Sequence, residues 1–291
     1  MRKTPLAVVA VLALLGTLGF VQIVRSFGHK ISDIPLPTLG PFCTVRADDE
    51  DGLVTLDPTQ MANAATITAV GLRRGMPERA ITVALATALQ ESKLENLDGG
   101  DRDSVGLFQQ RPSKGWGTPE KLQDPRYASD KFYAALKRVK GWEKMRVTDA
   151  AQRVQRSAYP NAYEKWADES AVLAKALNGR ATSAVACTIT GAPAKRGAAA
   201  TAALLNGLKL DWGKGLPKSA AAAEAAGLTV AVTSASAGWR YAHWLVSHAS
   251  DNGLERVRFA DMEWNAPDGT WQKVTADGGR DERRVIAQVF S

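Results

Sequence analysis

The residue in this sequence whose type and position point most directly to chemistry is a glutamate, Glu91. It lies in the stretch LQESKLENLDGGDRDSVGLFQQ, which runs from Leu89 to Gln110. Apolar residues before it recur at the spacing of one helix face, namely Ile81, Leu85, Ala88 and Leu89. Glu91 follows Ala88 by three residues and so lies at the edge of that buried face, where partial desolvation favours the protonated carboxyl. A carboxyl that is still protonated near neutral pH is what a general acid needs in order to protonate a leaving oxygen.

The same glutamate has a plainer explanation. Glu91, Lys93 and Glu95 alternate along the end of the predicted helix, and polar residues commonly occupy the exposed side of an amphipathic helix. Periodicity by itself therefore does not separate a catalytic glutamate from a solvated helix end. The rest of the chain has to supply the context.

Helices are the elements that must hold Glu91 in place. Ahead of it, Asp57 is a natural N-cap, Pro58 fits the first helical position and Gly75 follows the end of that helix. The helix that carries Glu91 is predicted over about residues 77–94. Further helices are predicted in TPEKLQ, DPRYASDKFYAALKRV, VTDAAQRVQRSAY and NAYEKWADESAVLAKALNG. The sequence thus predicts a mostly helical domain over residues 56–190.

The remainder of the chain divides into four segments around this domain. We expect residues 1–25 to be a transmembrane anchor, 26–55 a tether rich in proline and acidic residues, and 191–226 an alanine-rich linker. Residues 227–291 contain strand-like runs around one predicted helix, which indicates a small module. The expected fold class is a mainly α domain with a small C-terminal α+β module and an N-terminal transmembrane helix.

The N-terminal segment and the net charge bear on location and partners. Residues 4–24 form an uncharged run of 21 residues, long enough for the hydrocarbon core of a bilayer, and no A-x-A cleavage site follows it. Positive charges on its two sides are balanced, so they do not set its orientation. The formal charge of +7 suits an anionic neighbourhood such as phospholipid or a cell-wall polymer. No zinc-finger spacing or aromatic RNA-binding pattern accompanies the scattered basic residues, so we expect no nucleic-acid partner.

The two cysteines indicate the compartment. Cys43 precedes the helical domain, and Cys187 lies at its end, 144 residues later. A pair placed to clasp both ends of a domain is typical of an oxidising environment. We therefore predict a disulfide between them and main domains on the extracytoplasmic side of a cell membrane, with two buried free thiols as the alternative.

The residues around Glu91 resemble the lysozyme-like superfamily that includes soluble lytic transglycosylases and goose-type lysozymes. In that family a helix ends in ES, whose glutamate is the catalytic acid, and a loop then leads to a G-L-M-Q turn that lines the glycan cleft. Here ES is Glu91-Ser92, and GLFQ is Gly106–Gln109, with phenylalanine in the methionine position. The resemblance implies that Glu91 is the catalytic acid/base and that Gln109 and Ser104 position the glycan.

A later stretch, VQRSAYPNAY, lies where the family carries an aromatic and asparagine element facing the glutamate. Its residues differ from the usual pattern of the family, so Tyr159, Asn161 and Tyr163 are all candidates. We take Tyr163 as the substrate-binding residue, with Tyr159 as the alternative. The resemblance covers roughly residues 56–180 and implies a lysozyme-like fold for the mainly α domain. Its specific motifs occupy only about twenty residues.

The number of carboxylates bears on the reaction. A hydrolytic glycosidase normally uses two, about 5–9.5 Å apart. The loop after Glu91 offers Asp98, Asp101 and Asp103, but aspartates beside glycines are equally typical of turns. The resemblance implies that a lytic transglycosylase needs one glutamate, which protonates the leaving oxygen and then takes the proton from the 6-hydroxyl of muramic acid as a 1,6-anhydro ring closes. One glutamate without a clear partner favours the transglycosylase.

Other sites have weaker support. His243 and His248 are five residues apart, whereas helical zinc sites favour i, i+4 pairs with a third ligand, so we predict no metal and no cofactor. The C-terminal module contains four tryptophans that indicate its core, with a sugar-stacking platform as the alternative: Trp239, Trp244, Trp264 and Trp271.

These observations predict a membrane-anchored, extracytoplasmic enzyme whose partner is the glycan strand of peptidoglycan. It would cleave the β-1,4 bond between MurNAc and GlcNAc with Glu91 as its single acid/base. The alternative is a non-catalytic peptidoglycan-binding or scaffold protein of the cell envelope that keeps the cleft without turnover. The two differ in whether soluble fragments leave the wall.

Overall fold

The computed structural model describes residues 40–47, 52–217, 220–223, 227–274 and 281–291. Residues Pro41–Ser291 form one compact unit. The expected anchor at 1–25 lies outside the described residues, as does much of the expected tether at 26–55. Within the described part of the chain, no helix is long and apolar enough to cross a bilayer.

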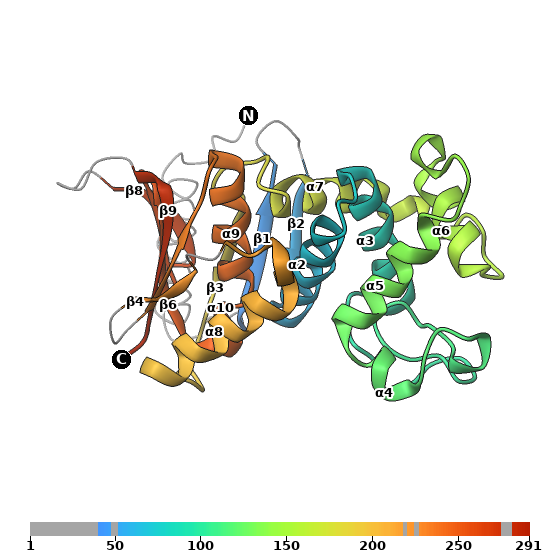
Figure 1. Cartoon of the computed structure of the whole chain (residues 1–291), viewed down its shortest axis with the longest axis horizontal. Helices are drawn as coiled ribbons and strands as arrows, with labels where there is room; N and C mark the ends of the chain where they lie inside the picture. Colours follow the sequence, from blue (N-terminus) through green and yellow to red (C-terminus); the bar gives the residue numbers. More distant parts are fainter. Residues whose placement is uncertain (1–39, 48–51, 218–219, 224–226, 275–280) are drawn as a thin grey trace, which may run out of the picture. The chain divides into compact units, whose positions relative to one another are not determined.

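Helices dominate the first two thirds of the described chain (Figure 1). They are α2 (Pro58–Arg73), α3 (Glu78–Ser92), α4 (Pro119–Leu122), α5 (Pro125–Leu136), α6 (Val147–Gln155), α7 (Ala167–Leu177), α8 (Gly197–Trp212), α9 (Ala235–Ser247) and α10 (Ala249–Asn252). Local sequence explains the start of α2. Asp57 accepts a hydrogen bond from the backbone N–H of Gln60, and the side chain of Gln60 accepts one from the N–H of Asp57. This capping box and Pro58 in the first turn begin the helix where the sequence predicts it.

Two antiparallel sheets form among the described residues. The smaller sheet has the strand order β2-β1-β3, and its strands are β1 (Phe42–Arg46), β2 (Leu53–Leu56) and β3 (Val185–Thr188). The larger sheet has the order β4-β5-β9-β6-β7-β8 and contains β4 (Ala221–Ala223), β5 (Gly227–Ala231), β6 (Leu254–Ala260), β7 (Met262–Asn265), β8 (Thr270–Lys273) and β9 (Asp281–Val289). The run RVRFADMEWN, predicted as a strand, forms the paired strands β6 and β7.

The expected fold class, a mainly α lysozyme-like domain with a small C-terminal module and a transmembrane helix, is wrong. The structure is mixed, with two antiparallel sheets. In the smaller sheet, β1 in the expected tether pairs with the neighbouring β2 on one side and with β3, at the end of the expected helical domain, on the other. Buried and exposed residues alternate in β1 and β2, but the two strands are only five and four residues long. β1 also pairs with β3, whose Cys187 lies 144 residues after Cys43, and no local pattern predicts that pairing.

Helix α9 joins the larger sheet to the rest of the core. It packs on β6 and β9 and also contacts α2, α7 and β3 (Figure 1). Trp239, Trp244 and Trp264 are buried there, which confirms the core interpretation for these three. Trp271 is partly exposed, and its indole donates to the carbonyl of Val185 in β3 at 2.7 Å. The expected linker at 191–226 contains α8, which contacts α2, β5 and β9.

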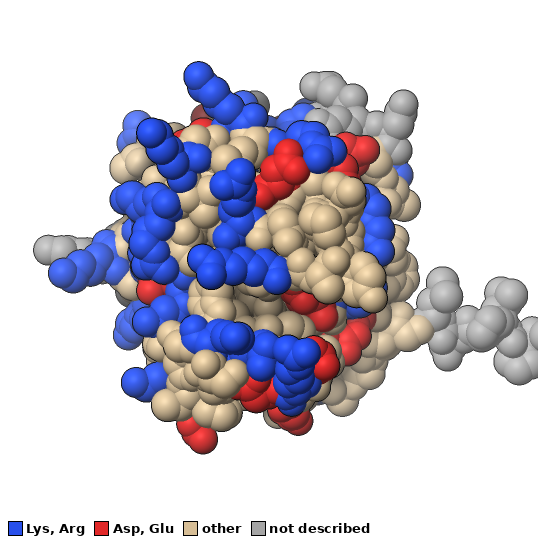
Figure 2. Space-filling model, turned by 90° about the vertical axis from the view of Figure 1, so that its right-hand side faces the viewer, with Lys and Arg blue, Asp and Glu red and all other residues tan. Residues whose placement is uncertain are grey.

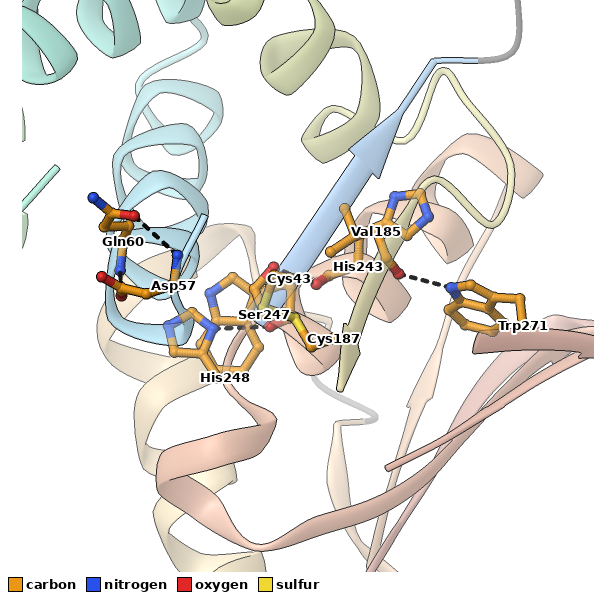
Figure 3. Close-up of a disulfide and its surroundings, with 10 residues drawn as sticks. Cys43, Asp57, Gln60, Val185, Cys187, His243, Ser247, His248 and Trp271 are labelled. Carbon is orange, nitrogen blue, oxygen red and sulfur yellow. Dashed lines mark hydrogen bonds between the residues drawn. A yellow bond between two sulfur atoms is a disulfide. The ribbon is translucent and has the colours of Figure 1, made fainter. Parts of the chain in front are cut away.

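A disulfide fastens the smaller sheet. Cys43 in β1 lies opposite Cys187 in β3, and their sulfurs are bonded (Figure 3). Both side chains are buried, and neither cysteine of the chain is free. The predicted pairing is therefore confirmed, and the alternative of two free thiols is wrong.

Removing this bond should cost a large part of the stability. The bond closes a loop between residues 144 apart, and for loops of this size we expect the Cys43→Ala/Cys187→Ala variant to lose about 2–5 kcal/mol of unfolding free energy. Urea unfolding of the variant and of the oxidised and reduced wild-type chain measures this loss. Reduced wild type should match the variant. Two reactive thiols in the oxidised protein would contradict the assignment.

Candidate active site

Glu91 lies in the last turn of α3, a helix that packs against α2, α5, α6 and α7. The helix ends because Lys93 and Leu94 both adopt left-handed backbone conformations. Two side chains of α2 hold this end: Gln60 donates to the carbonyl of Lys93 at 2.9 Å, and Asn63 donates to that of Leu94 at 2.7 Å. The position of Glu91 is thus fixed by the packing of α3 and by these two hydrogen bonds.

Two side chains from later in the chain bind the carboxyl of Glu91. The hydroxyl of Tyr163 donates to Oε1 of Glu91 at 2.7 Å, and Nε2 of Gln155 donates to the same oxygen at 3.2 Å. Gln155 also donates to the carbonyl of Phe108 at 2.7 Å, which fixes its amide. Glu91 is half-buried, and its Oε2 accepts no hydrogen bond from the described residues. A proton on the neutral carboxyl therefore belongs on Oε2.

Burial raises the pKa of Glu91 above its usual range, although the hydrogen bonds from Tyr163 and Gln155 act in the opposite direction. No other described carboxylate contributes to this shift. The pKa of Tyr163 is itself raised, first by burial and then by the neighbouring Glu91, so its phenol stays protonated as a donor. Burial therefore disfavours the charged form of the Glu91 carboxyl, whereas the hydrogen bonds from Tyr163 and Gln155 stabilise that charged form.

The turn after the glycine- and aspartate-rich loop is attached to the end of α3. Ser92 donates to the carbonyl of Leu107 at 2.7 Å, and Val105 and Gln110 pair across the turn in a short antiparallel bridge. Gly106 has a φ of 77°, and a Cβ there would meet the carbonyl oxygen of Leu122 at 2.5 Å. The ES and GLFQ motifs are therefore in direct contact, and glycine is required at the start of the turn.

The structure places the other predicted residues differently. Tyr163 reaches Glu91, whereas Tyr159 is 75% exposed and does not. The amide of Gln109 donates to the carbonyl of Gly106 at 3.2 Å and lies against the loop, away from the hydrogen-bonding atoms of Glu91. Ser104 is buried, and its N–H donates to the carbonyl of Asp101 in the loop. Neither of these two residues contacts the carboxyl in this conformation.

Sequence analysis missed Gln155 and the pair formed by Gln90 and Trp166. Gln155 was detectable, because it follows the buried Ala151 by four residues and so shares the inward face of α6. The indole of Trp166 donates to Gln90 at 3.0 Å, and the ammonium of Lys93 lies 3.8 Å from the centre of the indole ring. No pattern in the sequence predicts the contact between Gln90 and Trp166.

The described aspartates of the loop differ from Glu91 in their surroundings. Asp103 binds Nε of Arg111 at 2.8 Å and the N–H of Ser113 at 2.7 Å, and these contacts hold its pKa well below the usual range. Asp98 and Asp101 are exposed on the loop. Asp103 therefore stabilises the loop as an anion, and Glu91 is the carboxyl with a perturbed pKa at the helix end.

Other features of the described residues lie away from Glu91. A pocket of about 580 Å³ lies where β2 meets α7 and is lined by Gly52, Leu53, Val54, Thr55, Asp168, Glu169, Ala171 and Val172. His243 is buried between the N–H of Ala184 and the carbonyl of Ala176, which occupies both ring nitrogens. No group of three metal-ligating side chains occurs among the residues that the structure describes. Burial also raises the pKa of Glu169 in the pocket at β2 and α7, whereas at Glu91 the raised pKa is accompanied by hydrogen bonds from Tyr163 and Gln155.

Comparison with known proteins adds no relative to this description. No protein-family model matches the chain, and no curated protein matches it either.

Proposed function

We propose that this chain is a peptidoglycan-cleaving enzyme that acts outside the cytoplasm on the β-1,4 bond between MurNAc and GlcNAc. One observation carries the proposal: Glu91 is a half-buried carboxyl with a raised pKa whose Oε1 is held by Tyr163 and Gln155. Such a group is suited to general acid catalysis. The likeness of Glu91-Ser92 and Gly106–Gln109 to the motifs of lysozyme-like enzymes supports this substrate class.

The proposed reaction uses Glu91 twice. The proton on Oε2 moves to the bridging oxygen as the bond from the muramic acid C1 to that oxygen breaks. Hydrogen bonds from Tyr163 and Gln155 stabilise the carboxylate that this leaves. The carboxylate then removes the proton of the muramic acid 6-hydroxyl while its oxygen bonds to C1 and closes a 1,6-anhydro ring. Glu91 returns to its neutral form, and no water is consumed.

Two observations support a transglycosylase outside the cytoplasm. Asp103 is engaged by Arg111 and Ser113, so a second carboxylate for hydrolysis is not supplied by that residue. The disulfide between Cys43 and Cys187 is typical of proteins in oxidising compartments.

The alternative is a non-catalytic wall-binding or scaffold protein. It keeps the predicted role of Gln109 and Ser104 in positioning the glycan, and the hydrogen bonds of both residues hold them in the loop after Glu91. A protein of this class would bind glycan strands without turnover.

Incubation of the full-length chain with purified sacculi separates the two functions. The enzyme should release soluble fragments, and its Glu91→Gln variant should bind sacculi but release almost nothing. Equal binding by both proteins with no release by either would overturn the enzymatic proposal and support the binding protein.

The hydrogen bond from Tyr163 should set the upper pH limit of activity. This bond lowers the pKa of Glu91, so its loss in Tyr163→Phe should raise that pKa further. A general acid works in its protonated form, and activity is lost as the pH rises through its pKa. We therefore expect the alkaline limb of the pH–rate profile to move to higher pH, with a change of at most about tenfold at the optimum. An alkaline limb that stays in place, or moves to lower pH, would count against Glu91 as the acid.

A further inference from the structure

The positive charge of the chain is concentrated in one short segment. Residues 137–156, here called the basic segment, hold seven basic and two acidic residues, a net charge of +5 out of the formal +7 of the whole chain. All seven basic side chains are exposed: Lys137, Arg138, Lys140, Lys144, Arg146, Arg153 and Arg156. Basic residues are therefore denser in this segment than in the chain as a whole, and here they are all exposed.

Most of this charge is not neutralised within the protein. Arg146 forms an ion pair with Asp149 at 2.9 Å. The other six basic residues make no ion pair with any residue that the structure describes. Within the segment, Arg153 is also close enough to Asp149 to lower the pKa of that carboxyl, so two of the seven basic residues have an acidic neighbour.

The basic segment borders the candidate active site. It runs from the end of α5 through the short helix Trp142–Lys144 to α6, and α6 packs against α3. Gln155, which binds Glu91, lies between Arg153 and Arg156 in sequence. Figure 2 looks onto this helical side of the molecule and shows a hollow in the surface with Lys and Arg side chains along much of its border.

Two further lysines lie close to the residue that precedes Glu91. The ammonium groups of Lys93 and Lys165 lie 3.8 and 5.3 Å from the centre of the Trp166 ring. Trp166 binds Gln90, the residue before Glu91. Lysine side chains therefore also lie near the end of α3 that carries Glu91.

We propose that the basic segment binds an anionic polymer of the cell wall, with phosphate or carboxylate groups, that is attached to the glycan strand cleaved at Glu91. The inference rests on the proposed function, since it deepens the substrate class of that same site. A neutral sugar chain gains little from these exposed cations, whereas a polyanion gains attraction from each of them. A bilayer of anionic lipid is a poorer fit, because a membrane bound at this segment would cover the approach to Glu91.

Binding of full-length Glu91→Gln protein to sacculi tests the proposal without turnover. Lys140→Gln/Lys144→Gln should weaken binding by about three- to tenfold at 0.1 M salt, as expected for two exposed charge contacts. The matched control is Lys209→Gln/Lys214→Gln, which removes two exposed lysines on and after α8 and should leave binding unchanged. At 1 M salt, where the Debye length falls to about 3 Å, the effect of the first pair should disappear.

Sacculi stripped of phosphodiester-linked polymers by acid identify the anion. Loss of the Lys140/Lys144 effect on stripped sacculi supports the proposal and assigns phosphate, whereas an undiminished effect would place the anions on the peptidoglycan itself and overturn the attached polymer. Equal effects of the two lysine pairs, salt-independent binding, or an effect confined to vesicles of anionic lipid would overturn it. Charge-dependent binding together with no cleavage by the wild-type chain would overturn the proposed function alone.

Discussion

Glu91→Gln should lower the rate of glycan release from sacculi by about 10²–10⁴-fold, the usual contribution of a general acid. Glutamine keeps the size of the side chain and an oxygen that can accept the hydrogen bond from Tyr163, but it has no proton to give to the leaving oxygen. The same change removes the base that would take the proton of the 6-hydroxyl. Both halves of the proposed reaction therefore fail in this variant.

Glu95→Gln is the matched control for this experiment. Glu95 lies four residues further on and is exposed, so its loss should leave the rate within about twofold of wild type. Thermal unfolding should place both variants within a few degrees of wild type, because neither removes buried apolar contacts. A Glu91→Gln variant that keeps more than about a tenth of the wild-type rate would show that the glutamate is not the general acid.

Asp211→Asn should destabilise the fold by about 3–5 kcal/mol, the cost of leaving one member of a buried ion pair uncompensated. Asp211 is fully buried on α8, and its oxygens lie 2.6 Å from Nε of Arg126 on α5 and 2.8 and 2.9 Å from donors on Trp244 and Thr66. His248, between α9 and α10, lies 3.9 Å away. One carboxylate thus connects α2, α5, α8 and α9, so its loss should weaken the helical part and the C-terminal sheet together.

Urea unfolding with Asp268→Asn as the control measures this effect. Asp268 is exposed near β8, and its substitution should change the unfolding free energy by less than about 0.5 kcal/mol. Replacing both Asp211 and Arg126 by neutral residues should recover part of the loss, since the uncompensated charge is then gone. A single transition is expected for wild type, and separate unfolding of residues 227–291 would contradict the account of Asp211 as a connection across the core.

The parts of the candidate site that depend on residues close in sequence could be predicted. Helical periodicity predicted the helix of Glu91. The hydrogen bond from Ser92 to Leu107 was not predicted, although the resemblance drew attention to both motifs. Tyr163 was one of three candidates in its stretch, and the structure selects it through a hydrogen bond between residues 72 apart in sequence. Periodicity cannot rank such candidates, because the choice depends on how α6 and α7 pack against α3.

The parts of the fold that were missed depend on distant pairing. Alanine-rich composition predicted a linker at 191–226, but the buried Asp211 makes α8 part of the core. In the same way, β1 and β2 are short strands that pair with each other, and the distant β3 adds the third strand on the other side of β1. Composition describes how a segment behaves in isolation, whereas burial depends on partners elsewhere in the chain.

The most direct test of the central claim is mass spectrometry of the fragments that the full-length chain releases from purified sacculi. Ring closure by a single glutamate predicts 1,6-anhydro-muramic acid ends, one water lighter than the products of hydrolysis, and their absence with the Glu91→Gln variant. Fragments with reducing ends only would contradict ring closure and require a second carboxylate. Release that persists in Glu91→Gln would contradict the assignment of Glu91 itself.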